Sequence, residues 1–248
     1  AKELCLMRVS APIVVTKESG LQDDLSGTER AVSFDIAKDG KELEIVQSLA
    51  KWKRMALKKY KFPLHKGLYT DMSAIRRDDK VDETHSVYVD QWDWEKIIKR
   101  QDRTLEYLKR TVEKIVKAVA DTSEHIKAKG FEGVRISRDV HFITSQQLLD
   151  MFPTLSDKER EHEITKKYKT VFIMQIGDDL SDGKPHDLRA PDYDDWALNG
   201  DLLFYHEVLD KALEISSMGI RVDKESLLSQ IKKAGKMERL DYPFHKAI

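Results

Sequence analysis

Between residues 67 and 95, two stretches of alternating apolar and polar residues flank a charged loop, and this pattern predicts a pair of antiparallel strands. The first stretch ends at Ile75 and leads directly into Arg76. The second stretch alternates with a period of two, which places Gln91 and Asp93 on the same face. An arginine held rigidly at a strand end suits a planar or tetrahedral anion such as a phosphate. A plain hairpin with a solvated charged loop fits the same pattern.

In the rest of the chain, the spacing of apolar residues likewise distinguishes helices from strands. Helical spacing predicts helices over 1–9, 48–57 and 95–129 and after Ser145, Ser156 and Asp223. Alternating or continuous apolar runs predict strands over 11–15, 32–36, 43–45, 140–143, 170–176, 202–204 and 213–215. Two segments, 16–29 and 177–201, are rich in acids and are expected to be loops.

The order of these elements predicts an α+β fold, because the strands come in antiparallel groups that helices interrupt without strict alternation. A chain of 248 residues can bury one sizeable core. No repeat or Pro/Ser-rich linker divides it. We therefore expect residues 1–248 to form a single catalytic domain.

Amino-acid composition bears on the partners and the cellular compartment of the protein. Lys and Arg number 43 and Asp and Glu number 44, so net charge gives no indication of nucleic acid or of an anionic membrane as a partner. The single cysteine, Cys5, has no internal partner for a disulfide, which favours a reducing compartment. No apolar run is long enough to span a membrane, and the first residues lack the order of a signal peptide. We expect a cytoplasmic protein.

Carboxylates at strand ends are the main candidate chemistry, because phosphate loops, dinucleotide fingerprints, HExxH and CxxC motifs do not occur. Glu214 lies between two apolar residues of a predicted strand and faces the other side of the sheet. With Asp201 it could hold a hard cation such as Mg²⁺ through oxygen ligands. A solvated strand face is the alternative. His85 and His186 are expected to be surface residues.

Several motifs together resemble one family. These are QSLAKWK from Gln47, HSVYVDQWDWE from His85, RAPDYDDW within 180–196, and SSMGIRVD within 213–223. They are similar to the aspartate–ammonia ligases, the ammonia-dependent asparagine synthetases, which are related to the catalytic cores of aspartyl- and asparaginyl-tRNA synthetases. The similarity covers almost the full chain.

The resemblance implies a class II synthetase fold, with an antiparallel sheet flanked by helices, that works as a homodimer. It implies that L-aspartate, ATP and ammonia are converted to asparagine, AMP and pyrophosphate, with ATP and Mg²⁺ bound. It assigns catalysis to Asp23, Arg76 and Gln91, and ATP binding to Arg76, Asp194, Asp201 and Glu214, with Asp201 and Glu214 also holding the metal. It assigns aspartate binding to Ser48, Lys53, Asp93, Ser216, Ser217 and Arg221.

The reaction activates the side-chain carboxylate, so the aspartate is expected to lie reversed relative to the amino acid of a tRNA synthetase. Lys53 and Arg221 then hold its α-carboxylate and Asp93 its ammonium group. Its β-carboxylate attacks the α-phosphate beside Arg76, so the site contributes positioning and electrostatics. Asp23 is assigned to orient ammonium and take its proton before the attack on the adenylate.

Three differences from the family remain. The front of the first helix, a loop between Trp196 and Leu198, and a C-terminal glycine-rich segment with an arginine have no counterpart in the printed sequence. We expect these segments to belong to the complete protein, because the flanking motifs are intact. Two other functions stay open: an aspartyl- or asparaginyl-tRNA synthetase-like paralogue, which lacks an anticodon-binding domain here, and a non-catalytic sensor of amino acid or nucleotide.

Overall fold

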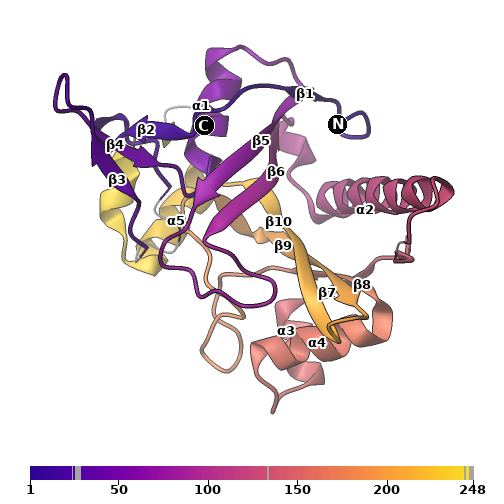
Figure 1. Cartoon of the computed structure of the whole chain (residues 1–248). Helices are drawn as coiled ribbons and strands as arrows, with labels where there is room; N and C mark the ends of the chain where they lie inside the picture. Colours follow the sequence, from indigo (N-terminus) through magenta and orange to yellow (C-terminus); the bar gives the residue numbers. More distant parts are fainter. Residues whose placement is uncertain (24, 26–28, 133, 243, 246–248) are drawn as a thin grey trace. The chain divides into compact units, whose positions relative to one another are not determined.

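The computed structural model describes residues 1–23, 25, 29–132, 134–242 and 244–245. The chain divides into two compact units. The first unit combines Ala1–Lys99 with Ile231–Ile248, and the second is Arg100–Gln230. Each unit has its own sheet structure and helices (Figure 1).

The centre of the first unit is the predicted antiparallel pair, β5 (Gly67–Ile75) and β6 (Tyr88–Lys96). Figure 1 shows the two strands side by side, joined by the charged loop. β1 (Leu6–Arg8) adds a parallel strand to the other edge of β5. The predicted helix over residues 1–9 is therefore wrong: residues 2–5 form a turn, and Leu6–Arg8 form a short edge strand because β5 offers them backbone hydrogen-bond partners.

A second sheet in this unit has the order β2-β4-β3, from β2 (Val14–Thr16), β3 (Ser33–Asp35) and β4 (Glu42–Ile45). The predicted hairpin is confirmed, with Gly40 at a positive φ of 68° in its turn. α1 (Ala50–Lys59) follows. One core cluster consists of Val15, Val46, Leu49, Met72 and Ala74.

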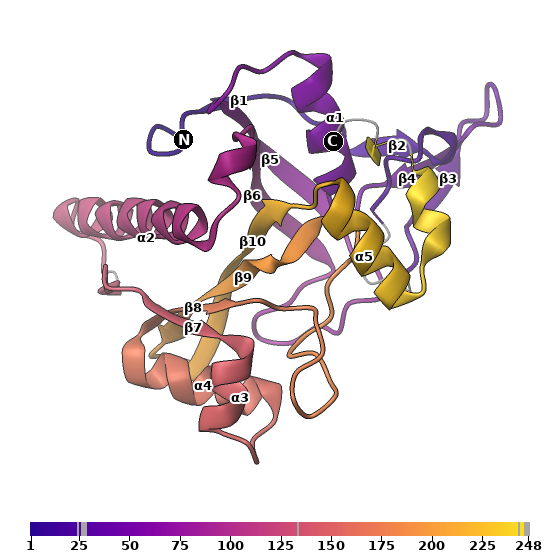
Figure 2. The same ribbon diagram turned by 180° about the vertical axis from the view of Figure 1, so that it is seen from behind.

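The second unit contains a four-stranded sheet of order β10-β9-β8-β7. Its strands are β7 (His141–Thr144), β8 (Thr170–Met174), β9 (Asp194–His206) and β10 (Lys211–Arg221). β7 and β8 are parallel, and the other pairs are antiparallel. α3 (Ser145–Met151) and α4 (Asp157–Tyr168) pack against it, as Figure 2 shows from behind.

Between Glu214 and Ser216, strand β10 contains one more residue than the facing segment of β9. Glu214 pairs with Leu203 and Ser216 pairs with Leu202, which leaves Ile215 as a β-bulge. Beyond the bulge, Ser217 lies opposite Asp201. The bulge therefore determines which serine faces this aspartate.

Two helix ends follow the sequence signals and three do not. The expected caps Ser48 and Ser145 are wrong, because Leu49 precedes α1 and Thr144 caps α3 with a capping box to Gln147. Ser156 donates its backbone N–H to the Glu159 carboxylate at 2.8 Å, which confirms the capping box of α4. Asp223 Oδ1 accepts the backbone N–H groups of Glu225 and Ser226, at 3.1 and 3.0 Å, before α5 (Lys224–Ala234). The long helix α2 (Leu105–Ala128) begins ten residues later than the pattern predicts, because β6 continues to Lys96, a 3₁₀ turn occupies Arg100–Asp102, and Thr104 caps the helix.

The predicted loop over 177–201 is also shorter than expected, since β9 already begins at Asp194. Acidic residues at the start of a strand hid the alternation. Short 3₁₀ turns occur at Lys17–Ser19, Arg100–Asp102 and Met237–Asp241. In the part of the chain that the structure describes, no helix combines the length and the apolar character needed to cross a bilayer.

Candidate functional site

In the first unit, the structure places Lys53 and Asp93 in contact. Lys53 lies on α1, and its Nζ donates to the Asp93 carboxylate on β6. The Lys53 side chain is 6% exposed and the Asp93 side chain 19%. A cation and an anion side by side, both largely buried, match the two charges of an amino-acid zwitterion.

Asp23 and Ser48 also come together in this unit. Asp23 is 2% exposed, accepts the Ser48 hydroxyl, and accepts the backbone N–H of Leu25 at 2.8 Å. The Gln47 side-chain amide donates to the Asp23 carbonyl at 3.1 Å, so the loop that carries this carboxylate is tied to the start of α1. These contacts hold Asp23 in one orientation.

Arg76 lies where β5 ends, as the pattern predicts. Its Nε donates to the Gln47 carbonyl oxygen at 3.2 Å, which orients the guanidinium without neutralising it. Among the described residues, no carboxylate lies within ion-pair distance of Arg76. Gln91 is exposed on β6, and the strand period places it on the same face as Asp93. As far as the described residues go, the terminal nitrogens of this guanidinium are open to an external anion.

In the second unit, Arg189 connects two predicted site residues. It donates through Nη2 to the Asp201 carboxylate on β9 and through Nη1 to the Ser217 hydroxyl on β10. Burial works against its charge, yet Asp201, Asp194 and Glu214 together raise the pKa of Arg189 above its usual value. The sequence reasoning did not single out Arg189, although the residue opens the motif RAPDYDDW.

Glu214 lies close enough to Asp201 to be affected by its charge. The Glu214 residue is exposed on β10. Desolvation of its carboxyl group by the surrounding protein raises the pKa of Glu214 from 4.5 to about 7, and the charge of Asp201 is the second cause. Burial likewise raises the pKa of Asp201, although Arg189 opposes this shift. Ser216 is half-buried next to the bulge.

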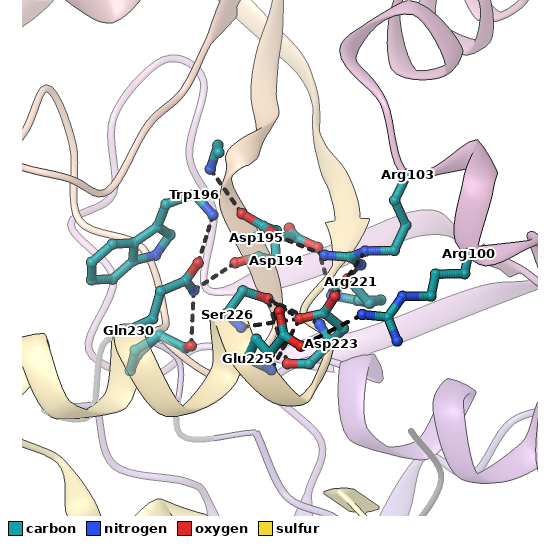
Figure 3. Close-up of polar contacts among 12 residues, drawn as sticks. Arg100, Arg103, Asp194, Asp195, Trp196, Arg221, Asp223, Glu225, Ser226 and Gln230 are labelled. Atoms are coloured by element: carbon teal, nitrogen blue, oxygen red, sulfur yellow. Dashed lines mark hydrogen bonds and ion pairs between the residues drawn. The ribbon is translucent and has the colours of Figure 1, made fainter.

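The ends of β9 and β10 form a third cluster, which Figure 3 shows in close-up. Arg221 Nη1 contacts Asp194 Oδ1 at 3.1 Å, across paired strand positions. A Cβ on Gly219 would lie 2.8 Å from the Asp194 carboxyl carbon, so glycine allows this approach. Two of the predicted site residues, Asp194 and Arg221, are therefore brought together.

Arg103 supports this cluster from the segment before α2. It donates to the Arg221 carbonyl oxygen, contacts Asp195 Oδ2 at 2.7 Å, and lies 3.4 Å from Asp223 Oδ2 (Figure 3). Its side chain is 15% exposed. No sequence pattern marks Arg103, because its partners come from β9, β10 and the start of α5.

A second polar layer from α4 lies near Glu214 and Asp201. His186 is 3% exposed, so the expectation that it is a surface residue is wrong. Its Nε2 lies 3.1 Å from Glu161 Oε1, and Lys158 donates to Glu161 at 3.0 Å. Burial opposes ionisation, but His186 and Lys158 lower the pKa of Glu161 below its usual value. His85, in contrast, is exposed as expected.

The residues present fit a divalent cation. Asp201 and Glu214 are neighbouring carboxylates whose ionisation is hindered, and a cation between them would relieve the repulsion. No group of three or more His, Cys, Asp or Glu side chains with metal-site geometry occurs within the described ranges. Mg²⁺ commonly uses only one or two carboxylates together with phosphate oxygens and water, so two are sufficient.

Solved structures share this fold. An asparaginyl-tRNA synthetase from Entamoeba histolytica, in complex with asparaginyl-adenylate, matches 98% of the chain with a TM-score of 0.67 at 12% identity. One from Pyrococcus horikoshii, also complexed with asparaginyl-adenylate, matches 98% with a TM-score of 0.63 at 13% identity. The chain spans about half of these proteins, 54% and 55%. The fold is that of a class II aminoacyl-tRNA synthetase core.

Sequence comparison identifies the family within that class. The family model described as aspartate–ammonia ligase matches residues 1–248. An aspartate–ammonia ligase of Clostridium tetani is 58% identical over 250 residues, which cover 100% of this chain and 73% of that protein. One of Bacillus cytotoxicus is 56% identical over 249 residues and is covered to 76%. The chain belongs to the aspartate–ammonia ligase family and is a ligase.

Proposed function

We propose that the protein makes L-asparagine from L-aspartate and ammonia in an ATP-dependent reaction. A β-aspartyl-AMP intermediate forms with release of pyrophosphate, and ammonia then displaces AMP. The observation that carries this proposal is the family match over residues 1–248. The candidate site residues of each unit are in chemically consistent contacts, which adds support.

The Lys53–Asp93 contact supports the assignment of these residues to aspartate. The α-carboxylate and α-ammonium groups of an amino acid sit on one carbon, so a protein cation next to a protein carboxylate complements both. We assign the α-carboxylate to Lys53 and Arg221 and the ammonium group to Asp93. Ser48, Ser216 and Ser217 supply hydroxyl groups for the same substrate. Its β-carboxylate is left for the reaction.

We assign Arg76 to the α-phosphate. An oxygen of the β-carboxylate attacks the α-phosphorus, the bond to the pyrophosphate oxygen breaks, and charge on the phosphate oxygens increases. A guanidinium that is oriented by a carbonyl but not neutralised stabilises this charge. Gln91 orients the reacting carboxyl group. Asp194 contributes to ATP binding.

Asp201 and Glu214 would hold Mg²⁺. When bound, the cation would neutralise phosphate charge and fix the nucleotide in position for attack.

Asp23 is assigned to the second half-reaction. It orients ammonium and accepts one proton. The ammonia nitrogen then attacks the β-carbonyl carbon, the bond to the AMP oxygen breaks, and the nitrogen loses a second proton to water. Its hydrogen bonds from Ser48 and Leu25 hold the carboxylate in place for this role. We further propose that residues 1–248 act as a single catalytic domain within a cytoplasmic homodimer, as the resemblance implies.

The experiment is an assay of the full-length protein with aspartate, ATP, Mg²⁺ and ¹⁵N-labelled ammonium. Labelled asparagine and AMP, in equal amounts, are the expected products. ADP in place of AMP, or no asparagine, would contradict the proposal. A parallel reaction with tRNA in place of ammonium tests the synthetase-like alternative, and no charged tRNA is expected.

A further inference from the structure

Arg189 is the residue that the proposed reaction has not used. It comes from the segment between β8 and β9, and it lies among Asp201, Asp194 and Glu214. Asp194 has its own cation, Arg221, at 3.1 Å. Arg189 is thus the guanidinium that faces the two carboxylates assigned to the metal.

The contacts of Arg189 are specific. Its two terminal nitrogens reach two different strands, Asp201 on β9 and Ser217 on β10, which are opposite each other in the register. Its side chain is 17% exposed and that of Asp201 is 9% exposed. The charge pair is therefore largely shielded from water and only weakly screened by salt.

Close packing fixes the base of Arg189. Gly177 has a φ of +115°, and a Cβ there would lie 2.9 Å from the Arg189 Cβ and 2.7 Å from the Trp196 ring. Only a glycine allows this approach. Within the described part of the chain, the Arg189 Nε is buried without a hydrogen-bond partner, so the two terminal nitrogens carry the contacts of the guanidinium.

We propose that Arg189 is the resident counter-ion and positioning residue of the metal-binding carboxylates, and that it competes with the divalent cation for Asp201. This proposal rests on the proposed function, which assigns Asp201 and Glu214 to Mg²⁺. Without metal, Arg189 neutralises one of the two carboxylates and holds Asp201 and Ser217 in fixed geometry. When a cation binds, its attraction to Asp201 is weakened by the neighbouring guanidinium.

If Arg189 is a counter-ion, its removal should increase metal affinity. A residue that only supports the fold would weaken metal binding when it is removed. Removing a competing positive charge should strengthen metal binding instead and should destabilise the metal-free protein. The two effects together distinguish the roles.

The experiment is calorimetric titration of the full chain with Mn²⁺ alone and Mg²⁺ alone, in the absence of nucleotide. Arg189→Gln is expected to bind either metal more tightly than the parent by about tenfold, because one positive charge is lost next to the carboxylates. In EDTA its unfolding temperature should be lower than that of the parent, and saturating Mg²⁺ should reduce the difference.

Two further variants complete the test. Arg189→Lys keeps the charge but loses the two-pronged contact, so its metal affinity should rise by about threefold, between parent and Arg189→Gln, and this variant decides if Arg189→Gln fails to fold. Lys184→Gln removes an exposed cation from the same loop and should leave metal affinity unchanged.

Equal or weaker metal binding by folded Arg189→Gln, or parent-like binding by Arg189→Lys, would overturn the proposal. If the parent protein binds neither metal, alone or with ATP, the assignment of Asp201 and Glu214 to a metal fails, and this inference fails with it. Metal binding by the parent with no change in the variants would refute the inference alone.

Discussion

The Lys53–Asp93 contact in the first unit and the Arg189–Asp201 contact in the second are both buried pairs of a cation and a carboxylate, but their surroundings differ in charge. Lys53 faces Asp93, and Arg76 has no carboxylate within ion-pair distance among the described residues. Arg189 faces three carboxylates, of which Glu214 has its pKa raised to about 7. The first arrangement suits a zwitterion and an anion, whereas the second suits a cation.

A substitution of Arg76 should have the largest effect, and it tests whether the first unit binds an anion. Arg76→Lys should lower kcat/KM for ATP on the order of a thousandfold, because a point charge does not reproduce an oriented guanidinium on a phosphate. The unfolding temperature should hardly change, since the side chain loses one hydrogen bond to a carbonyl. Steady-state kinetics and thermal unfolding measure the two effects.

Arg77→Lys, at the exposed neighbouring position, is the matched control and should retain nearly full activity. An Arg76→Lys enzyme with more than about a tenth of the parent activity would contradict the phosphate role.

Glu214→Gln tests whether the carboxylates of the second unit bind a cation. It should lower kcat/KM for ATP by about a hundredfold, since one carboxylate for the cation is lost. The stability of the protein in EDTA should not fall, because two neighbouring negative charges no longer repel each other.

Chemical unfolding in EDTA and kinetics at varied Mg²⁺ provide the measurements. Glu225→Gln removes an exposed carboxylate that lies 3.6 Å from Arg100 and should change neither quantity. Loss of stability in Glu214→Gln would mean that this residue supports the fold.

Asp93→Asn probes the pair in the first unit. The KM for aspartate should rise by about tenfold to a hundredfold, while the KM for ATP stays within about twofold. Because Lys53 remains buried without its partner charge, the free energy of unfolding should also fall, by about 3 kcal/mol. An unchanged KM for aspartate would remove Asp93 from the amino-acid site.

Arg103→Met is expected to have the smallest effect on chemistry. It leaves Asp195 and Asp223 without their shared guanidinium, which should cost about 2–3 kcal/mol of stability. Arg110→Met, which removes an exposed i,i+4 pair at 3.7 Å, should cost less than about 0.5 kcal/mol. Urea unfolding of both variants checks the difference, and similar values for the two would show that Arg103 is not a structural anchor.

Local patterns in the sequence predicted much of this architecture. The β5–β6 pair, the Ser156 capping box and the Asp223 cap depend on residues close in sequence, and all were found. The first strand was missed because its partner, β5, lies sixty residues away. The start of β9 was missed because Asp194 and Asp195 look like loop residues until Arg221 and Arg103 pair with them.

The same distinction applies to the candidate site. Motif resemblance identified residues such as Asp201 and Arg221, and Glu214 was visible as a charge within an apolar strand. Arg189 lies within one of the quoted motifs but was given no role, and Arg103 lies in none of them. Their importance arises from contacts with strands that only the folded chain brings near, and neither has a spacing that marks it in advance.

The extra residue in β10 fixes the phase of the strand from Ser216 to Gly219, after which the register shifts a second time. If Ile215 were paired regularly with Leu202, Ser216 would sit across from Asp201, and the residues from Ser217 to Gly219 would turn to the opposite face of the sheet. A single inserted amino acid therefore determines which side chains of this strand face the proposed substrate.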